Sequence, residues 1–322
     1  MTAEREHFNE VESLFKDKSV LESNNDFFRH LIKDAIYGGN HAGVFRSDNL
    51  SELGVNNGLV EYVPGETPFT SINWGASFNY RFGELKANRK LKNVKPSIWI
   101  VSDILNPVNQ NTLGKNTIRS LGALTIFGFA NAYIQQGFPV GTILTNGMGG
   151  YFDQFTENSK SRLNNVAGKL VQLARIEDGQ PDPDESMLYK VLRKASSKIE
   201  DKSMIILVSR FRNDQSSEWQ KAAKGLIRSG NSILGVQIKH EIDDKLPEEV
   251  DSFYMPESGK VFSIGGKKYR GHIAEAYETN AKTVQTGIES VFKAGNARLV
   301  TLSTESGDWQ QQLKNGLAGS DQ

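Results

Sequence analysis

Residues 97–109 read SIWIVSDILNPVN, and the apolar run that opens this stretch stops at Asp103. Four similar runs follow along the chain: PVGTILT (139–145), SMIILVS (203–209), SILGVQIK (232–239) and ARLVTLST (297–304). Strands that are apolar without alternation are typical of sheets buried on both faces, and such sheets are mostly parallel and flanked by helices. Residues 97–102 therefore predict an inner strand of an α/β sheet.

Stretches with helical spacing separate these runs, at about 117–136, 158–176, 184–200, 216–229 and 272–294, and a last one begins near 308. A hairpin is expected within 250–264. The element order predicts a doubly wound, mostly parallel, Rossmann-like sheet. We expect three parts: a helical N-terminal segment (1–39), a small strand-rich module (40–95) and the α/β domain (96–322).

The N-terminal segment contains apolar residues at helical spacing. One set is Phe8, Val11, Leu14 and Phe15, and a second helix is expected over 26–37, capped by Asn25 or Asp26. Two interpretations remain open here. Either these stripes pack on the chain's own core, or they dock on a partner.

The composition restricts the class of protein. Lys+Arg and Asp+Glu each number 38, so no basic excess favours nucleic acid. Cysteine is absent, which excludes disulfides, zinc–thiolate sites, iron–sulfur clusters and thiol catalysis. The charged N-terminal sequence is not that of a secretory signal, and the most apolar run (121–134) is shorter than the roughly 20 residues that span a membrane. We expect a cytoplasmic protein without a membrane span.

Catalytic motifs are not found in the sequence. It has no phosphate-binding loop of the G-x-x-x-x-G-K type, no G-x-S-x-G turn and no H-E-x-x-H pair. The glycine-rich stretch NGMGG (146–150) is interpreted as a loop, with a phosphate cradle as the alternative. The carboxylate pairs Asp243–Asp244 and Glu248–Glu249 are interpreted as solvated. We predict no catalytic residue and no cofactor, so the chain is not expected to be an enzyme.

A combination of motifs resembles a known family. EYVPGETPFTSINWGASF (61–78) precedes the strand that ends at Asp103, and MIILVSRF (204–211) follows about a hundred residues later. This order is similar to that of the bacterial domain of unknown function 58 family, whose signature turn is kept here at Tyr62, Pro64, Gly65 and Trp74. The resemblance implies a von Willebrand factor A-like domain and, as partner, an AAA+ ATPase of the MoxR type.

The same resemblance implies a degenerate metal site. The family's domain type holds Mg²⁺ with oxygen ligands from three loops, and Asp103 matches the first aspartate. Leu105 and Pro107 stand where two serines are expected, Ser186 stands at the threonine position, and Arg210 replaces the last carboxylate.

We therefore predict a metal-free site in which the Arg210 guanidinium bridges to Asp103. Two alternatives stay open at this point. In one, Arg210 lies in solvent and Asp103 caps the following loop. In the other, an unorthodox metal site uses Asp103, Asn106 and Asp214.

The first functional hypothesis is a non-catalytic adaptor that binds a protein through the carboxyl edge of the sheet. Its interaction candidates are Asn106, Asn109, Asn111, Arg212 and Asp214. One alternative is a structural subunit of a larger bacterial assembly or secretion complex, docked through the N-terminal helices. The other is an enzyme or binding protein for a small phosphate-bearing ligand, held by Arg210, Lys115, Arg212 and the NGMGG loop.

Overall fold

A computed structural model describes residues 11–37, 59–61, 85–88, 96–105, 117–146, 151–154, 161–174, 187–199, 203–211, 218–246, 252–255, 260–263, 267–293 and 297–318. The chain divides into two units, one made of Met1–Phe45 with Ser97–Gln322 and the other of Arg46–Pro96. In the smaller unit, β1 (Leu59–Glu61) pairs antiparallel with β2 (Lys86–Asn88).

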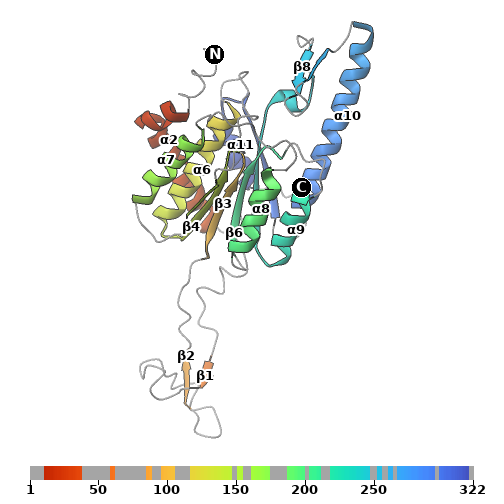
Figure 1. Ribbon diagram of the computed structural model, residues 1–322. Helices are drawn as coiled ribbons and strands as arrows, with labels where there is room; N and C mark the ends of the chain where they lie inside the picture. The colour runs from red at the N-terminus through yellow and green to blue at the C-terminus, as the bar shows by residue number, and fades with distance from the viewer. Residues whose placement is uncertain are drawn as a thin grey trace. The chain divides into compact units, whose positions relative to one another are not determined.

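The larger unit is built on a six-stranded sheet with the order β10-β7-β6-β3-β4-β5 (Figure 1). Neighbouring strands are parallel except for β5, which runs antiparallel to β4 at one edge. The strands are β3 (Ile98–Ser102), β4 (Val140–Thr145), β5 (Tyr151–Gln154), β6 (Met204–Ser209), β7 (Ser232–Lys239) and β10 (Ala297–Ser303).

Helices cover both faces of this sheet (Figure 1). One face carries α2 (Lys18–Tyr37), α6 (Ile118–Gln135), α7 (Ser161–Ala174) and α11 (Trp309–Ala318). The other carries α8 (Met187–Lys198), α9 (Glu218–Arg228) and α10 (Lys267–Phe292). Between β7 and α10 lie the short helix η3 (Glu241–Asp243) and the hairpin β8 (Ser252–Met255) and β9 (Lys260–Ser263).

The two-sided cover explains the apolar sequence of β3. Every residue from Ile98 to Ser102 is buried. Ile98 and Ile100 pack into the core on the α6 face, whereas Trp99 and Val101 pack into the core on the α8 face. Because successive side chains of a strand point to opposite faces, both faces of β3 need apolar residues.

The predicted fold class is confirmed. The chain forms a doubly wound, mostly parallel, Rossmann-like and von Willebrand A-like α/β fold with a helical N-terminus and a small β-rich pair. From the sequence, only a loop (146–150) was predicted after Val140–Thr145, and the edge strand β5 (Tyr151–Gln154) was not predicted. This strand has only four residues and includes Asp153 and Gln154, so it lacks the continuous apolar run by which the other strands of this sheet were predicted.

The N-terminal helices pack on the chain's own core. Phe28 and Ile32 of α2 are completely buried against α6, and Phe15 contacts Phe127 edge to face with ring centroids 5.1 Å apart. Helix α2 begins at Lys18, so the expected cap at Asn25 or Asp26 was wrong. Of the two interpretations of these apolar stripes, the structure supports packing on the core over docking on a partner.

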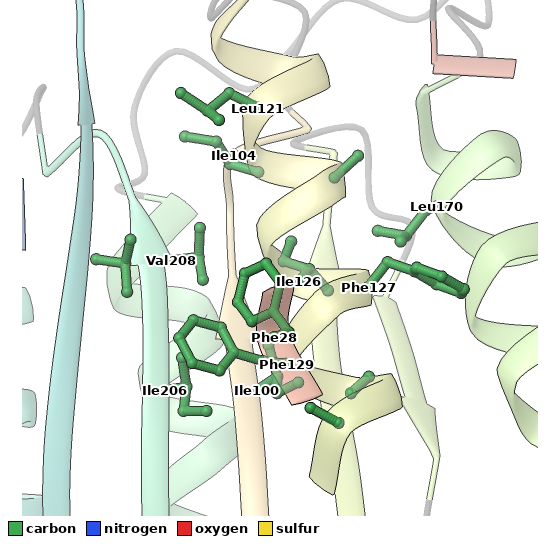
Figure 2. Packing of buried hydrophobic residues seen from close by; sticks show 14 of the residues in the cluster. Phe28, Ile100, Ile104, Leu121, Ile126, Phe127, Phe129, Leu170, Ile206 and Val208 are labelled. Atoms are coloured by element: carbon green, nitrogen blue, oxygen red, sulfur yellow. The ribbon is translucent and has the colours of Figure 1, made fainter. Parts of the chain in front are cut away.

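Helix α6 is buried almost all round because it lies between the sheet and the helices α2 and α7. Figure 2 shows the Phe28 ring set against α6 beside Ile126 and Phe129. The Phe28 and Phe129 rings meet edge to face with centroids 4.8 Å apart. This approach requires a glycine, because a Cβ at Gly128 would lie 2.2 Å from the Phe28 ring.

We expect Gly128→Ala to lower the free energy of unfolding by about 1–3 kcal/mol, since the added methyl must displace a ring in a filled core. Urea unfolding measures this change. The matched control is Gly168→Ala on α7, where an added Cβ meets nothing within 4 Å. There alanine should leave stability unchanged or raise it by up to about 1 kcal/mol through helix propensity. Equal losses in both variants would contradict this account of the α2–α6 contact.

A second prediction concerns Asp17, which caps α2. Its Oδ1 accepts hydrogen bonds from the Ser19 hydroxyl (2.7 Å) and from the backbone N–H groups of Ser19 (2.9 Å) and Val20 (3.4 Å). The Ser19 hydroxyl, followed by these backbone donors, lowers the pKa of the Asp17 carboxyl. A depressed carboxyl pKa contributes stability above the unfolded-state value, and this contribution is lost as the pH falls through the folded-state value.

Asp17→Ala should therefore lower Tm at neutral pH, and the difference from wild type should shrink as the pH falls below about 4. Thermal unfolding followed by circular dichroism across this range tests it. Glu22→Ala, at an exposed position of the same helix, is the control and should show no such pH-dependent difference. A deficit for Asp17→Ala that persists undiminished at acid pH would show that the charge is not responsible.

Candidate functional site

The order in which strands are added to the sheet reverses between β3 and β6: the chain continues from β3 toward one edge of the sheet and from β6 toward the other. These strands are parallel neighbours, with Ser102 opposite Val208. Helix α6 connects β3 to β4 on one face, and α9 connects β6 to β7 on the other. Where the crossovers depart in opposite directions, the carboxyl ends of the strands leave an opening in which doubly wound proteins place their binding sites. Asp103 and Arg210 follow these two strand ends directly.

Local hydrogen bonds shape this edge. The Ser102 hydroxyl donates to the Val208 carbonyl (2.7 Å) and accepts from the Ile104 N–H (3.1 Å). On the neighbouring strand, the Ser209 hydroxyl accepts from the Phe211 N–H (2.9 Å). Each serine thus turns the chain directly after its strand, so that the residues between lie at the edge of the sheet.

Phe211 holds the turn after β6 in an unusual conformation. Its φ is 52°, in the left-handed region that bulky residues rarely adopt. The ring is buried, with centroids 5.4 Å from Trp219 of α9 and 5.5 Å from Phe292 of α10. Packing against two helices offsets the backbone strain, and it fixes the position of the preceding Arg210.

The Arg210 guanidinium makes a two-point contact with a carboxylate. Nη2 donates to Asp243 Oδ1 (2.6 Å) and Nε donates to Asp243 Oδ2 (3.3 Å). Both side chains are shielded from solvent, with 12% of Arg210 and 4% of Asp243 exposed. A paired, charge-assisted contact of this kind has both strength and a defined geometry.

The sequence hypothesis for Arg210 therefore named the wrong carboxylate. The observed contacts direct the guanidinium to Asp243 and not to Asp103, and the alternative that Arg210 lies in solvent is also wrong. Asp243 itself was interpreted as a solvated residue but is buried in the structure. Asp243 lies 33 residues from Arg210 in the sequence and within an acidic run, so the sequence did not indicate this pairing.

Asp243 also belongs to a hydrogen-bonded turn that starts at His240. The His240 N–H donates to Asp243 Oδ2 (3.1 Å), and the Asp243 N–H donates to the His240 carbonyl (2.9 Å). His240 Nδ1 accepts from the Ile242 N–H (3.1 Å), and His240 Nε2 lies 2.7 Å from Glu305 Oε1. The ends of β6, β7 and β10 are thus joined by one polar network.

This network was missed from the sequence, although a signal for it exists. A histidine placed directly after an apolar strand and before Glu241, Ile242 and Asp243 has the spacing of a helix-capping sequence. In the structure both of its ring nitrogens are engaged in polar contacts.

The remaining predicted positions fall in two groups. Asp103 is half-buried at the end of β3, with its Oδ1 atom inaccessible to solvent, and Leu105 is completely buried in the core. The others lie outside the described residues: Pro107, Ser186, Asn106, Asn109, Asn111, Arg212, Asp214 and the signature turn of Tyr62, Pro64, Gly65 and Trp74.

Two further observations bear on the chemistry of this chain. Within the described ranges, no group of three or more His, Cys, Asp or Glu side chains is placed to hold a metal ion. Among the helices that the structure describes, none combines the length and apolarity needed to cross a lipid bilayer.

Comparison with known proteins gives distant similarities. No protein-family model matches the sequence, and no curated protein matches it. Among solved structures, the conserved hypothetical protein BatB from Bacteroides thetaiotaomicron aligns with 62% of this chain and 100% of its own, at 13% identity and a TM-score of 0.37.

Two other solved structures are comparably distant. An aerotolerance-related membrane protein from Bacteroides fragilis aligns with 61% of this chain and 99% of its own (15% identity, TM-score 0.34). The pilus adhesin SpaC from Lactobacillus rhamnosus GG aligns with 83% of this chain and 36% of its own (14% identity, TM-score 0.41). The fold assignment rests on the strand order and connections described above.

The contact between Arg210 and Asp243 makes a prediction about stability. Asp243→Ala should lower the free energy of unfolding by about 3 kcal/mol, because it leaves a guanidinium that is largely shielded from water without its counter-charge. The neighbouring Asp244→Ala is the control. Asp244 is 52% exposed and pairs with Lys239, so its loss should cost less than about 1 kcal/mol. Urea unfolding of the two variants tests the difference, and comparable losses would contradict the role given to Asp243.

Proposed function

We propose that this chain is a non-catalytic protein-interaction adaptor whose carboxyl sheet edge is held by an internal ion pair in place of a bound cation. The observation that carries the proposal is the two-point contact between Arg210 and Asp243 at the end of β6. The partner we propose, from the resemblance described above, is an AAA+ ATPase of the MoxR type.

The charges at this edge support a mode of binding that is independent of metal ions. A divalent cation needs several oxygen ligands around it, and the Asp243 carboxylate at this edge is already engaged by Arg210. Arg210 is permanently charged, and at position 105 a buried leucine offers no ligand atom. In the sequence, Leu105 and Pro107 stand beside Asp103 where the family pattern has two hydroxyl-bearing serines.

A protein partner is also favoured because the described residues of this edge form no catalytic arrangement. His240 has both ring nitrogens engaged, and no cysteine exists in the chain. A rigid edge carrying fixed charges suits recognition, because contact residues placed on loops above a stiff scaffold lose little freedom on binding. We propose Asn106, Asn109, Asn111, Arg212 and Asp214 as these contact residues.

The alternatives have less support. The structural-subunit hypothesis used the apolar faces of the N-terminal helices as its docking surface, and α2 buries that face on the chain's own core. The phosphate-ligand hypothesis used Arg210, which would first have to release Asp243.

A capture experiment tests the adaptor hypothesis. The tagged chain is incubated with lysate of the native organism in three buffers: with Mg²⁺ and ATP, with Mg²⁺ alone, and with EDTA. Bound proteins are identified by mass spectrometry. We expect a MoxR-type ATPase in the eluate, retained in the EDTA arm when no nucleotide is present. Arg210→Ala should reduce its recovery about tenfold or more, because it leaves the buried Asp243 carboxylate without its counter-charge and disturbs the edge.

Arg228→Ala is the matched control. Arg228 is an exposed arginine at the end of α9, so its removal should leave recovery unchanged. Circular dichroism confirms that each variant is folded before capture. Absence of any AAA+ ATPase in all three buffers would show that the proposed partner is wrong. Capture that EDTA abolishes in the absence of nucleotide would show that the edge depends on a metal ion.

A further inference from the structure

We propose that His240 is a proton-sensitive cap, and that its protonation opens the Glu241–Asp243 turn and releases Asp243 from Arg210. The proposed function places partner binding at this edge. The switch would regulate that binding, so its biological meaning rests on the proposed function. The turn and its cap are observed independently of any partner.

The cap is unusual in its chemistry. At the start of a helical turn, Ser, Thr, Asp or Asn commonly accepts the first free backbone N–H, and none of these loses its acceptor near neutral pH. Here the acceptor is Nδ1 of His240, 3.1 Å from the Ile242 nitrogen. Histidine is the side chain whose charge changes between about pH 5 and about pH 8. This turn therefore begins at an acceptor that a proton can remove.

The geometry determines which nitrogen receives the proton. A backbone N–H only donates, so Nδ1 must carry a lone pair in the closed turn. The ring proton of the neutral imidazole is then on Nε2, where it points to Glu305 Oε1 at 2.7 Å. A second proton has only Nδ1 as its destination. Once there, it faces the Ile242 N–H, and two donors oppose each other where one hydrogen bond had been.

Opening this turn affects two contacts at once. The turn positions the Asp243 carboxylate for Arg210, through the bond of the Asp243 N–H to the His240 carbonyl and the bond of the His240 N–H to Asp243 Oδ2. The Ile242 carbonyl accepts from the Tyr277 hydroxyl of α10 at 2.6 Å. Protonation of one imidazole would thus loosen the ion pair at the end of β6 and the attachment of α10.

Several charged groups surround His240 in the described part of the chain. Glu305, which follows β10, contacts Nε2 and is 39% exposed. Asp243 accepts the His240 backbone N–H and is neutralised by Arg210 from β6. On the same strand Lys239 pairs with Asp244. Protonation therefore strengthens the contact with Glu305 while it breaks the bond to Ile242, and the turn is the element that must yield.

Amide hydrogen exchange followed by NMR tests the switch in the full chain without a partner. Protection factors of Ile242, Asp243 and Asp244 are measured from about pH 8 to about pH 5. After correction for intrinsic exchange rates, we expect protection of this turn to fall about tenfold or more in acid. The inner strand 233–238 is the internal reference and should keep its protection.

His240→Asn is the decisive variant, since asparagine can cap the turn but does not titrate. Its turn should be protected equally at both ends of the pH range. His272→Asn, at an exposed position of α10, is the matched control and should titrate like wild type. Acid-induced loss of protection that persists in His240→Asn would overturn the proposal, as would a wild-type turn whose protection does not change with pH.

A measurement on the wild-type chain keeps the proposal testable if His240→Asn does not fold. Long-range ¹H–¹⁵N spectra report whether Nδ1 of His240 is protonated. Protonation of Nδ1 should coincide with the loss of protection at Ile242, and protonation that leaves the Ile242 amide protected would overturn the switch. A pH-sensitive turn combined with no ATPase capture would leave this inference standing and reject the proposed function. Capture combined with a pH-insensitive turn would do the reverse.

Discussion

The structure depends on one constraint, which is that β3 lies inside the sheet and is buried on both faces. All five of its residues are covered, with isoleucines facing α6 and Trp99 and Val101 facing α8. No polar side chain that needs water fits within such a strand, apart from a serine that bonds to the neighbouring strand. Charged residues can therefore occur only beyond its ends, which is where Asp103 and, on the next strand, Arg210 are found.

The strand order leaves an opening at the carboxyl edge of the sheet, between β3 and β6. Because α6 and α9 leave in opposite directions, the ends of β3 and β6 are not covered by a common connection. Arg210 places a positive charge at this edge, and Asp243 of η3, which follows β7, balances it. Burying an ion pair gives little net stability, because desolvation offsets the attraction. Its value here lies in holding three strand ends and η3 in one arrangement.

Much of the fold could be predicted from the sequence, and the reasons are physical. The strands Ile98–Ser102 and Met204–Ser209 could be predicted because a strand that is covered by helices on both faces consists almost entirely of apolar residues. The strand Tyr151–Gln154 could not be predicted in this way, because it is short and contains Asp153 and Gln154. The start of α2 was placed eight residues too late, since Asn25 and Asp26 resemble caps. In the structure Asn24 lies within the helix and donates from Nδ2 to the Leu124 carbonyl.

The sequence by itself determined that β3 and β6 are inner strands, that an aspartate and an arginine follow them, and that position 105 has no ligand atom. These properties depend on residue type and on neighbours near in the chain. Only the tertiary structure decided that Arg210 pairs with Asp243, that His240 caps the turn carrying Asp243, and that Glu305 meets the same imidazole. A charge has many potential partners along a sequence, and the close approach of the strand ends selects one of them.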